Sequence, residues 1–227
     1  MYRGRPNAYT LNANQRLWRV HSHRHSAAEF NPGPSAEHES AGHTGGPDAR
    51  HAGGHDGGRF GSTLEHPYAY YYAGSEQTTA IAEVLLRDEL RFNESGYRVL
   101  PRQVVLRLRI SAVQTVRPLT LVSLCSGPDL AAAAVGVWLV QGGSAPDASR
   151  AAAHWLRDRA PWADGLIWTS TIDLGKPAVV LFQDRCGPDA ITELPNHAID
   201  LSDDKGIGWL NEALAPYHTQ VRPPRRR

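Results

Sequence analysis

The stretch Gly57–Arg87 reads GGRFGSTLEHPYAYYYAGSEQTTAIAEVLLR and combines a glycine-flanked arginine, a run of tyrosines and a segment of small and apolar residues. Residues 68–73 alternate as a β-strand does. Since successive side chains of a strand point to opposite faces, Tyr71 and Tyr72 are expected on different faces. One face can be core, and the other can line a pocket.

The segment after this strand is expected to form a helix capped by Ser75 or Thr78, because hydroxyl groups accept the free N–H groups of a first turn. Glu83 lies on that helix, opposite its apolar side and four residues before Arg87. A pair at this spacing commonly forms a surface ion pair worth about 0.3 kcal/mol. A carboxylate near a glycine-flanked arginine can also belong to a binding site.

The composition indicates one domain with tails. The chain has 227 residues, 41% of them hydrophobic, and a formal net charge of +1, which gives no general attraction to nucleic acid or membranes. Cys125 and Cys186 are too few and too far apart for a disulfide framework or a Cys-based zinc site, and they favour a cytoplasmic protein with reduced thiols. No apolar run approaches the ~20 residues that span a membrane.

Polar segments flank and interrupt the domain, which is expected to span residues 16–216. Residues 1–15 are expected to be flexible, and residues 217–227 to be a basic disordered tail. Between about 31 and 57 no large apolar residue occurs, so we expect a flexible Gly/His-rich insertion. Its histidines could bind a metal, but their irregular spacing does not favour a metal site. They are His38, His43, His51 and His55.

Strands and helices are expected in a mixed order, which argues for an α+β fold rather than a doubly wound sheet. The first strand, around residues 16–20, is expected to have a solvent-facing side that carries Arg19. A lone arginine there is typical of a surface charge. The other expected strands span residues 103–110, 119–124, 164–171 and 178–182. Helices are expected near residues 129–140, 147–159 and 208–215.

Short blocks in a fixed order make the chain similar to the RES-domain family over roughly residues 16–185. The family takes its name from an arginine, a glutamate and a serine, for which Arg59, Glu83 and Ser170 are the candidates. The similar blocks are Leu17–Val20, Glu29–Pro32, Gly58–Phe60, Tyr71–Ala73, Ala80–Val84, Gly165–Ser170 and Val180–Phe182.

The resemblance implies an ADP-ribosyltransferase-like mixed β core with surrounding helices. It implies an enzyme that cleaves NAD at the nicotinamide–ribose bond, with phosphate as acceptor in an NAD phosphorylase or water in a glycohydrolase. It also implies a toxin of a type II toxin–antitoxin system, which depletes cellular NAD and is neutralised by a small DNA-binding antitoxin. NAD is then a substrate, and no cofactor is implied.

The chemistry of NAD cleavage assigns roles to the charged residues. A guanidinium binds a pyrophosphate bidentately, so Arg59 would bind NAD, with Arg19 as a second clamp. Breaking an N-glycosidic bond develops positive charge on the ribose, as in glycoside hydrolysis. The carboxylate of Glu83 would stabilise that charge electrostatically.

A tyrosine ring can stack on the cationic nicotinamide. The family's usual spacing to the glutamate favours Tyr72 for this role, whereas the Tyr-x-Ala pattern favours Tyr71, so both stay candidates. Ser170 would bind the ribose or orient Glu83. An arginine often follows this serine in the family, but this chain has Thr171, which weakens the prediction of a phosphate contact there.

Two other functions remain open. The chain could transfer ADP-ribose to a macromolecule, which would show as a mass increase on the target. It could also be a non-catalytic NAD-binding or interaction module, which would bind NAD without turnover.

Overall fold

The computed structural model describes residues 4–33, 58–87, 92–141 and 146–223, and its main feature is an eight-stranded sheet. Among its neighbouring strands, one pair, formed by residues 119–124 and 165–169, runs parallel and the others antiparallel. In spatial order the strands are β1 (Ala8–Leu11), β6 (Leu119–Leu124), β7 (Gly165–Thr169), β8 (Pro177–Phe182), β3 (Tyr70–Gly74), β2 (Arg16–Ser22), β5 (Leu108–Thr115) and β9 (Ile191–Asp200).

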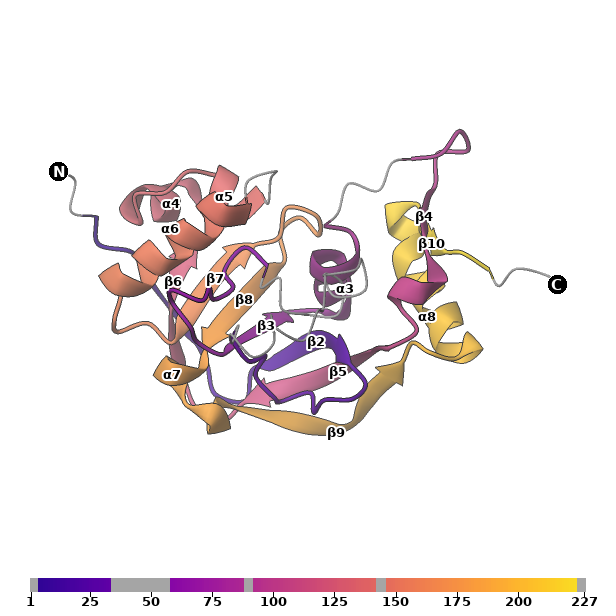
Figure 1. Ribbon diagram of the computed structural model, residues 1–227, viewed down its shortest axis with the longest axis horizontal. Helices are drawn as coiled ribbons and strands as arrows, with labels where there is room; N and C mark the ends of the chain where they lie inside the picture. The colour runs from indigo at the N-terminus through magenta and orange to yellow at the C-terminus, as the bar shows by residue number, and fades with distance from the viewer. Residues whose placement is uncertain (1–3, 34–57, 88–91, 142–145, 224–227) are drawn as a thin grey trace.

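Helices surround this sheet, so the α+β prediction is confirmed. In Figure 1, α4–α6 gather at one end and α8 at the other, with α3 between them. None of the helices in the described ranges is long and apolar enough to cross a membrane. The helices are α3 (Gln77–Leu85), α4 (Gly127–Ala132), α5 (Trp138–Gln141), α6 (Pro146–Arg159), α7 (Gln183–Cys186) and α8 (Asp204–Leu214). The 3-10 turns are η1 (Arg102–Val104), η2 (Pro188–Ala190) and η3 (Ala215–Tyr217).

The inner face of the sheet forms one apolar core. Every strand contributes to it, which requires the sheet to curl around the cluster. Phe30 closes the cluster on one side, and Cys186 and Ala190 close it at α7 and η2. The strand residues of this inner core are Leu11, Leu17, Tyr71, Ala73, Val113, Leu119, Leu121, Ile167, Val179, Leu181 and Ile191.

The outer face carries two further apolar clusters. One packs β6, β7 and β8 against α4, α5 and α6, and includes Trp168 and Tyr70. The other packs β2 and β5 against α3 and α8, and includes Ile81 and Leu210. In Figure 1, α3 lies between the two groups of helices, and it contacts β2, β3 and β8, so it stands beside both clusters.

Two segments that were expected to be disordered contain strands. β1 pairs with β6, from Ala8 opposite Val122 to Leu11 opposite Leu119. Three of its four residues are exposed, so the sequence carries no burial pattern that would predict an edge strand. In the expected tail, β10 (Thr219–Val221) pairs in parallel with β4 (Arg98–Leu100). Asn31, the first residue of the expected insertion, pairs with Tyr70 in an isolated β-bridge. The four histidines of the insertion lie outside the described residues.

The predicted strand at 103–110 is wrong in its first half. Residues 102–104 form η1 instead, and β5 begins at Leu108 and runs on to Thr115. The predicted hydroxyl cap of α3 is also wrong. Glu76 precedes the helix, and no side chain caps it.

Candidate active site

An arginine–glutamate–arginine cluster lies at the junction of the two outer clusters. Nη2 of Arg59 donates to Oε2 of Glu83 at 2.6 Å, and Nη2 of Arg87 donates to the same oxygen at 2.9 Å. Glu83 is 8% exposed, so the pair with Arg87 is not the surface ion pair that helical spacing alone suggests. Arg59 also donates to the carbonyl oxygen of Val140 at the end of α5.

Two glycines bring the elements of this cluster together. A Cβ on Gly74 would lie 2.6 Å from the backbone nitrogen of Ala80, so glycine is required where β3 turns into α3. Gly58 has a φ of +59°, a conformation that glycine adopts without strain. A Cβ at this position would lie 3.2 Å from the hydroxyl oxygen of Tyr72 and 3.3 Å from Nη1 of Arg87. The positive φ and the close neighbours together explain why a glycine precedes Arg59.

The two guanidinium groups keep Glu83 ionised. Burial alone would raise the pKa of Glu83, but the charges of Arg59 and Arg87, with hydrogen bonds from Ser170 and Arg87, hold it below its usual value. Burial and the neighbouring charge of Arg87 lower the pKa of Arg59 to about 10, which leaves Arg59 protonated at neutral pH. The cluster thus carries one negative and two positive charges.

Ser170 directly follows β7, and its side chain lies near the Glu83 carboxylate. It is completely buried, and its Oγ accepts the backbone N–H groups of Ile172 at 3.3 Å and Asp173 at 3.0 Å. Its hydroxyl group lies near enough to Glu83 to help lower the carboxyl pKa. Oε1 of Glu83 nevertheless has no partner within normal hydrogen-bond limits among the described residues.

Of the two candidate tyrosines, Tyr72 lies at this cluster. Its hydroxyl oxygen accepts the backbone N–H of Phe60 at 2.7 Å, and its ring meets Trp168 edge to face with centroids 6.1 Å apart. Tyr71 points to the inner core, is completely buried and donates its hydroxyl hydrogen to the carbonyl of Ala27 at 2.8 Å. The alternation that the sequence predicts places the two rings on opposite faces of the sheet.

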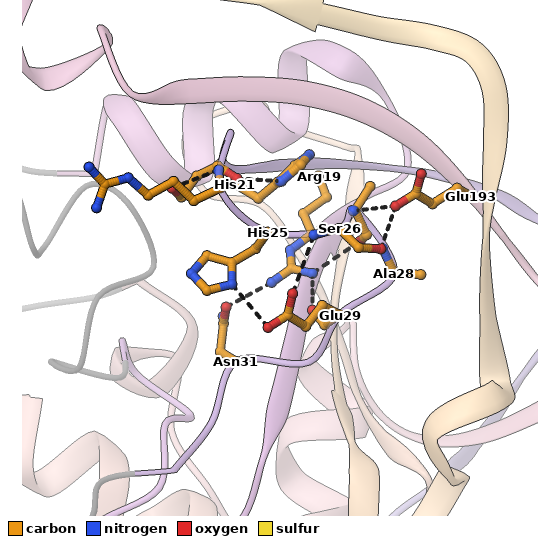
Figure 2. A network of polar contacts seen from close by, with 11 residues as sticks. Arg19, His21, His25, Ser26, Ala28, Glu29, Asn31 and Glu193 are labelled. Atoms are coloured by element: carbon orange, nitrogen blue, oxygen red, sulfur yellow. Dashed lines mark hydrogen bonds and ion pairs between the residues drawn. The ribbon is translucent and has the colours of Figure 1, made fainter. Parts of the chain in front are cut away.

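Arg19 is on the inner face with Tyr71, away from Glu83. Figure 2 shows its guanidinium enclosed by the chain that follows β2. Nη1 donates to the carbonyl of Ala27 at 3.0 Å and also to that of Glu29, and Nη2 donates to Oδ1 of Asn31 at 2.7 Å. Its guanidinium carbon lies 4.4 Å from the centroid of the Tyr71 ring. The solvent-facing position expected for Arg19 is therefore wrong, because this loop covers that face of β2.

Two members of the site are not evident from the sequence. Helical spacing indicates Arg87 only as a surface partner of Glu83, and Trp168 lies inside the similar block Gly165–Ser170 without a role of its own. The indole of Trp168 lies under Arg59, with the guanidinium carbon 5.4 Å from its ring. Among the described residues, buried polar atoms at the site lack a hydrogen-bond partner. These atoms are Nε of Arg59, Nε of Arg87, Oε1 of Glu83 and Nε1 of Trp168.

This arrangement can bind an anion and stabilise a cation side by side. Guanidinium groups with spare donors suit phosphate oxygens, whereas an ionised carboxylate suits a developing positive charge. Within the described ranges, His, Cys, Asp and Glu side chains form no group of three or more that could hold a metal ion.

Fold and cluster together define an α+β protein with a buried arginine, glutamate and serine on the outer face of a curled sheet. The RES domain model matches residues 16–204, and the chain belongs to the RES domain family.

A solved structure with a similar fold is the Mycobacterium tuberculosis toxin MbcT, in a crystal structure of the MbcT–MbcA toxin–antitoxin complex. The match has a TM-score of 0.52 and 15% sequence identity, and it covers 87% of each chain. At 15% identity, this similarity supports a shared fold and nothing more specific. No curated protein sequence matches the chain.

Proposed function

We propose that this RES-family chain is an enzyme that cleaves NAD at the nicotinamide–ribose bond. The proposal rests above all on Glu83, a buried carboxylate that two guanidinium groups keep ionised. In the reaction, the N-glycosidic bond breaks and nicotinamide leaves with the bonding electron pair. An oxygen of inorganic phosphate or water then bonds to the ribose carbon.

Glu83 has the charge that this reaction needs. The ribose becomes oxocarbenium-like as nicotinamide leaves, and a nearby carboxylate stabilises that positive charge most where water is excluded. Ser170, which lies against the carboxylate, would orient it or hold a ribose hydroxyl group. Oε1 of Glu83 is the oxygen with capacity for a ribose hydroxyl group.

Arg59 and Arg87 would bind the pyrophosphate of NAD. Both contact Glu83 through Nη2, and each has a buried Nε–H without a partner among the described residues. Their two positive charges exceed the single negative charge of Glu83, so the cluster attracts an anion. We therefore assign the second clamp to Arg87 in place of Arg19, whose guanidinium is occupied by the loop of residues 27–31.

Tyr72 is the better placed of the two tyrosines to stack on nicotinamide. It is half-buried beside the cluster, and its ring is fixed by edge contacts with Tyr70 and Trp168. Tyr71 is completely buried under Arg19. An aromatic face next to the carboxylate suits a flat cationic leaving group.

The proposed biological role is that of a toxin which depletes NAD in the cell and is neutralised by a small DNA-binding antitoxin. Support comes from the family and from the fold that the chain shares with MbcT, which was solved in a complex with its antitoxin. Expression of the chain alone should lower cellular NAD and arrest growth. Co-expression with a small protein encoded beside it should restore both.

The direct test is release of nicotinamide from NAD by the purified protein, measured with and without phosphate. A phosphorylase gives phosphorylated ADP-ribose and is accelerated by phosphate, whereas a glycohydrolase gives ADP-ribose at the same rate in both. If NAD binds but no nicotinamide appears under either condition, the chain is a binding module. A mass increase on an added protein, with little free ADP-ribose, would instead indicate a transferase.

Glu83→Gln keeps the size of the side chain and removes its charge. We expect kcat to fall by about 100-fold or more, as when a group that stabilises transition-state charge is lost. The exposed Glu65, changed to Gln, is the matched control and should leave kcat unchanged. A Glu83→Gln protein that folds normally and keeps wild-type kcat would contradict the role of Glu83.

A further inference from the structure

The turn that follows β7 carries Ser170 and determines the hydrogen bonds of its hydroxyl group. The backbone N–H of Ser170 donates to the carbonyl of Lys176 at 2.9 Å, which closes the turn. Ser170 Oγ accepts the N–H groups of Ile172 and Asp173, so its own hydrogen is directed elsewhere. The Glu83 carboxylate lies near this hydroxyl group, which helps to lower the carboxyl pKa. The position of Ser170 therefore depends on how the turn is fixed relative to α3.

The side chain of Asp173 joins this turn to α3. Its Oδ2 accepts the hydroxyl groups of Thr78 at 2.9 Å and Thr79 at 2.8 Å. The hydroxyl of Tyr217 in η3 also lies against this carboxylate, and burial together with this hydrogen bond raises the pKa of Tyr217 to about 12. Three hydroxyl groups from two separate elements thus meet one carboxylate.

The contact with α3 falls one turn before Glu83. Thr79 and Glu83 are four residues apart, so they lie on the same side of the helix, and Thr79 is completely buried. Asp173 therefore connects to Ser170 through its backbone N–H and to the helix of Glu83 through its side chain.

We infer that Asp173 is a positioning residue of the proposed reaction, which fastens the β7–β8 turn to α3 so that Ser170 faces Glu83. The kinetic part of this inference rests on the proposed function, whereas the contacts of Asp173 do not depend on it. Asp173 need not touch the substrate, because it acts through Ser170 and Glu83. If Asp173 fixed only the loop, a change at Asp173 would not act through Ser170.

The same turn has a second link to α3 that serves as a matched control. Nζ of Lys176 forms an ion pair with Glu76, the residue before the helix. Both side chains are exposed, at 39% and 50%, and exposed ion pairs contribute little to stability. If any tether between turn and helix mattered equally, Glu76→Gln would behave like a change at Asp173.

The kinetic test compares Asp173→Ala, Asp173→Asn, Ser170→Ala and the double variant Asp173→Ala/Ser170→Ala. We expect Asp173→Ala to lower kcat by about 10- to 100-fold with little change in KM, as when a reacting group is slightly misplaced. Asn keeps an oxygen that accepts both threonine hydroxyls, so Asp173→Asn should retain most of the activity. The double variant should be no slower than Ser170→Ala, because both changes act on one contact.

A second measurement needs no turnover. The carboxyl carbon of Glu83 can be titrated by NMR in the wild type, in Asp173→Ala and in Thr79→Val, which removes one hydroxyl partner of Asp173. Since Ser170 helps to lower the pKa of Glu83, a displaced turn should raise the titration midpoint in both variants. Glu76→Gln should leave the midpoint unchanged. Thr79→Val also serves if Asp173→Ala does not fold.

The outcomes separate this inference from the proposed function. If the wild type releases no nicotinamide, the proposed function fails, and the titration alone decides the inference. An unchanged Glu83 midpoint in Asp173→Ala and Thr79→Val would overturn it. So would kinetic losses that multiply in the double variant, or an equal loss in Glu76→Gln.

Discussion

At the scale of single residues, Arg19 and Arg87 differ in what their guanidinium groups contact. Arg19 donates to two backbone carbonyl groups and one amide oxygen, all within the chain that follows β2. Arg87 contacts Glu83 and keeps a buried Nε–H without a partner among the described residues. An arginine whose donors are satisfied by the fold contributes to the fold, whereas one with spare donors can bind a ligand.

Changing Arg87 to Ala should therefore weaken NAD binding. We expect KM for NAD to rise by about 10- to 100-fold, because one charged hydrogen bond to phosphate contributes about 1.5–3 kcal/mol. The change in kcat should be smaller, since Arg59 still holds Glu83 ionised. Steady-state kinetics and calorimetric titration with NAD measure both effects.

Two controls accompany the Arg87 variant. Arg87→Lys keeps the charge but loses the planar fork, so its KM should be intermediate. The exposed Arg24, changed to Ala, removes a positive charge elsewhere and should leave KM unchanged. A wild-type KM in Arg87→Ala would show that the anion binds without Arg87.

How far sequence alone predicts this site differs from residue to residue. Arg59, Glu83 and Ser170 come together in the structure, as the family order of the blocks indicates. Strand alternation correctly separates Tyr71 from Tyr72, but it cannot say which face holds the cluster. Arg87 was missed because helical spacing gives the same pair whether the helix face is buried or exposed.

At the scale of elements, apolar alternation predicts the central strands but not the edges. Residues 119–124 and 178–182 form β6 and β8 because their side chains are buried on both faces. β1 and β9 are edge strands whose residues are mostly exposed, so neither shows the burial alternation that indicates a strand. Pairing partners, rather than local pattern, make these segments strands.

One element depends on a glycine for its pairing. A Cβ at Gly165 would lie 2.1 Å from the carbonyl oxygen of Val180, where β7 meets β8. Gly165→Ala should therefore push the two strands apart and lower the free energy of unfolding by about 1–3 kcal/mol or more. Urea unfolding measures the loss. Because Ser170 ends the same segment, kcat should also fall.

Gly127 is the matched control for this substitution. It lies in the first turn of α4, and a Cβ there would meet nothing within 4 Å. Gly127→Ala should be neutral or slightly stabilising, since alanine favours helices by up to about 1 kcal/mol over glycine. Equal losses of stability at both positions would show that the close contact between β7 and β8 does not matter.

At the scale of the whole molecule, the curl of the sheet decides which side chains are buried. The sequence of β2 predicts a solvent-facing side that includes Leu17, Arg19 and His21. All three are buried, because the loop after β2 covers this face and the eight strands curl around a common core. Local periodicity detects two faces of a strand, but the covering of each depends on segments far away in the sequence.

His21 makes this enclosure sensitive to pH. Burial and the neighbouring Arg19 and Arg109 lower its pKa from 6.5 to about 4, although Ser22 and Glu193 oppose the shift. Its ring nitrogens contact the Ser22 carbonyl and the Ser111 hydroxyl, each at 2.9 Å. Between pH 6.5 and 4 the unfolded chain binds a proton that the folded chain does not. Stability therefore falls as the pH drops through this window, by about 2–3 kcal/mol at pH 4.5.

The measurement is urea unfolding at pH 7.5 and 4.5 in the wild type, His21→Gln and His23→Gln. Above pH 6.5 His21 is neutral in both states and contributes no pH dependence, so the variants are compared by their loss between the two pH values. His21→Gln should lose about 2–3 kcal/mol less than the wild type over this interval. His23 is exposed, and His23→Gln should lose as much as the wild type. If His21→Gln shows the full wild-type loss, the acid sensitivity of the fold arises at other groups, and the loop over β2 does not enclose a histidine that must stay neutral.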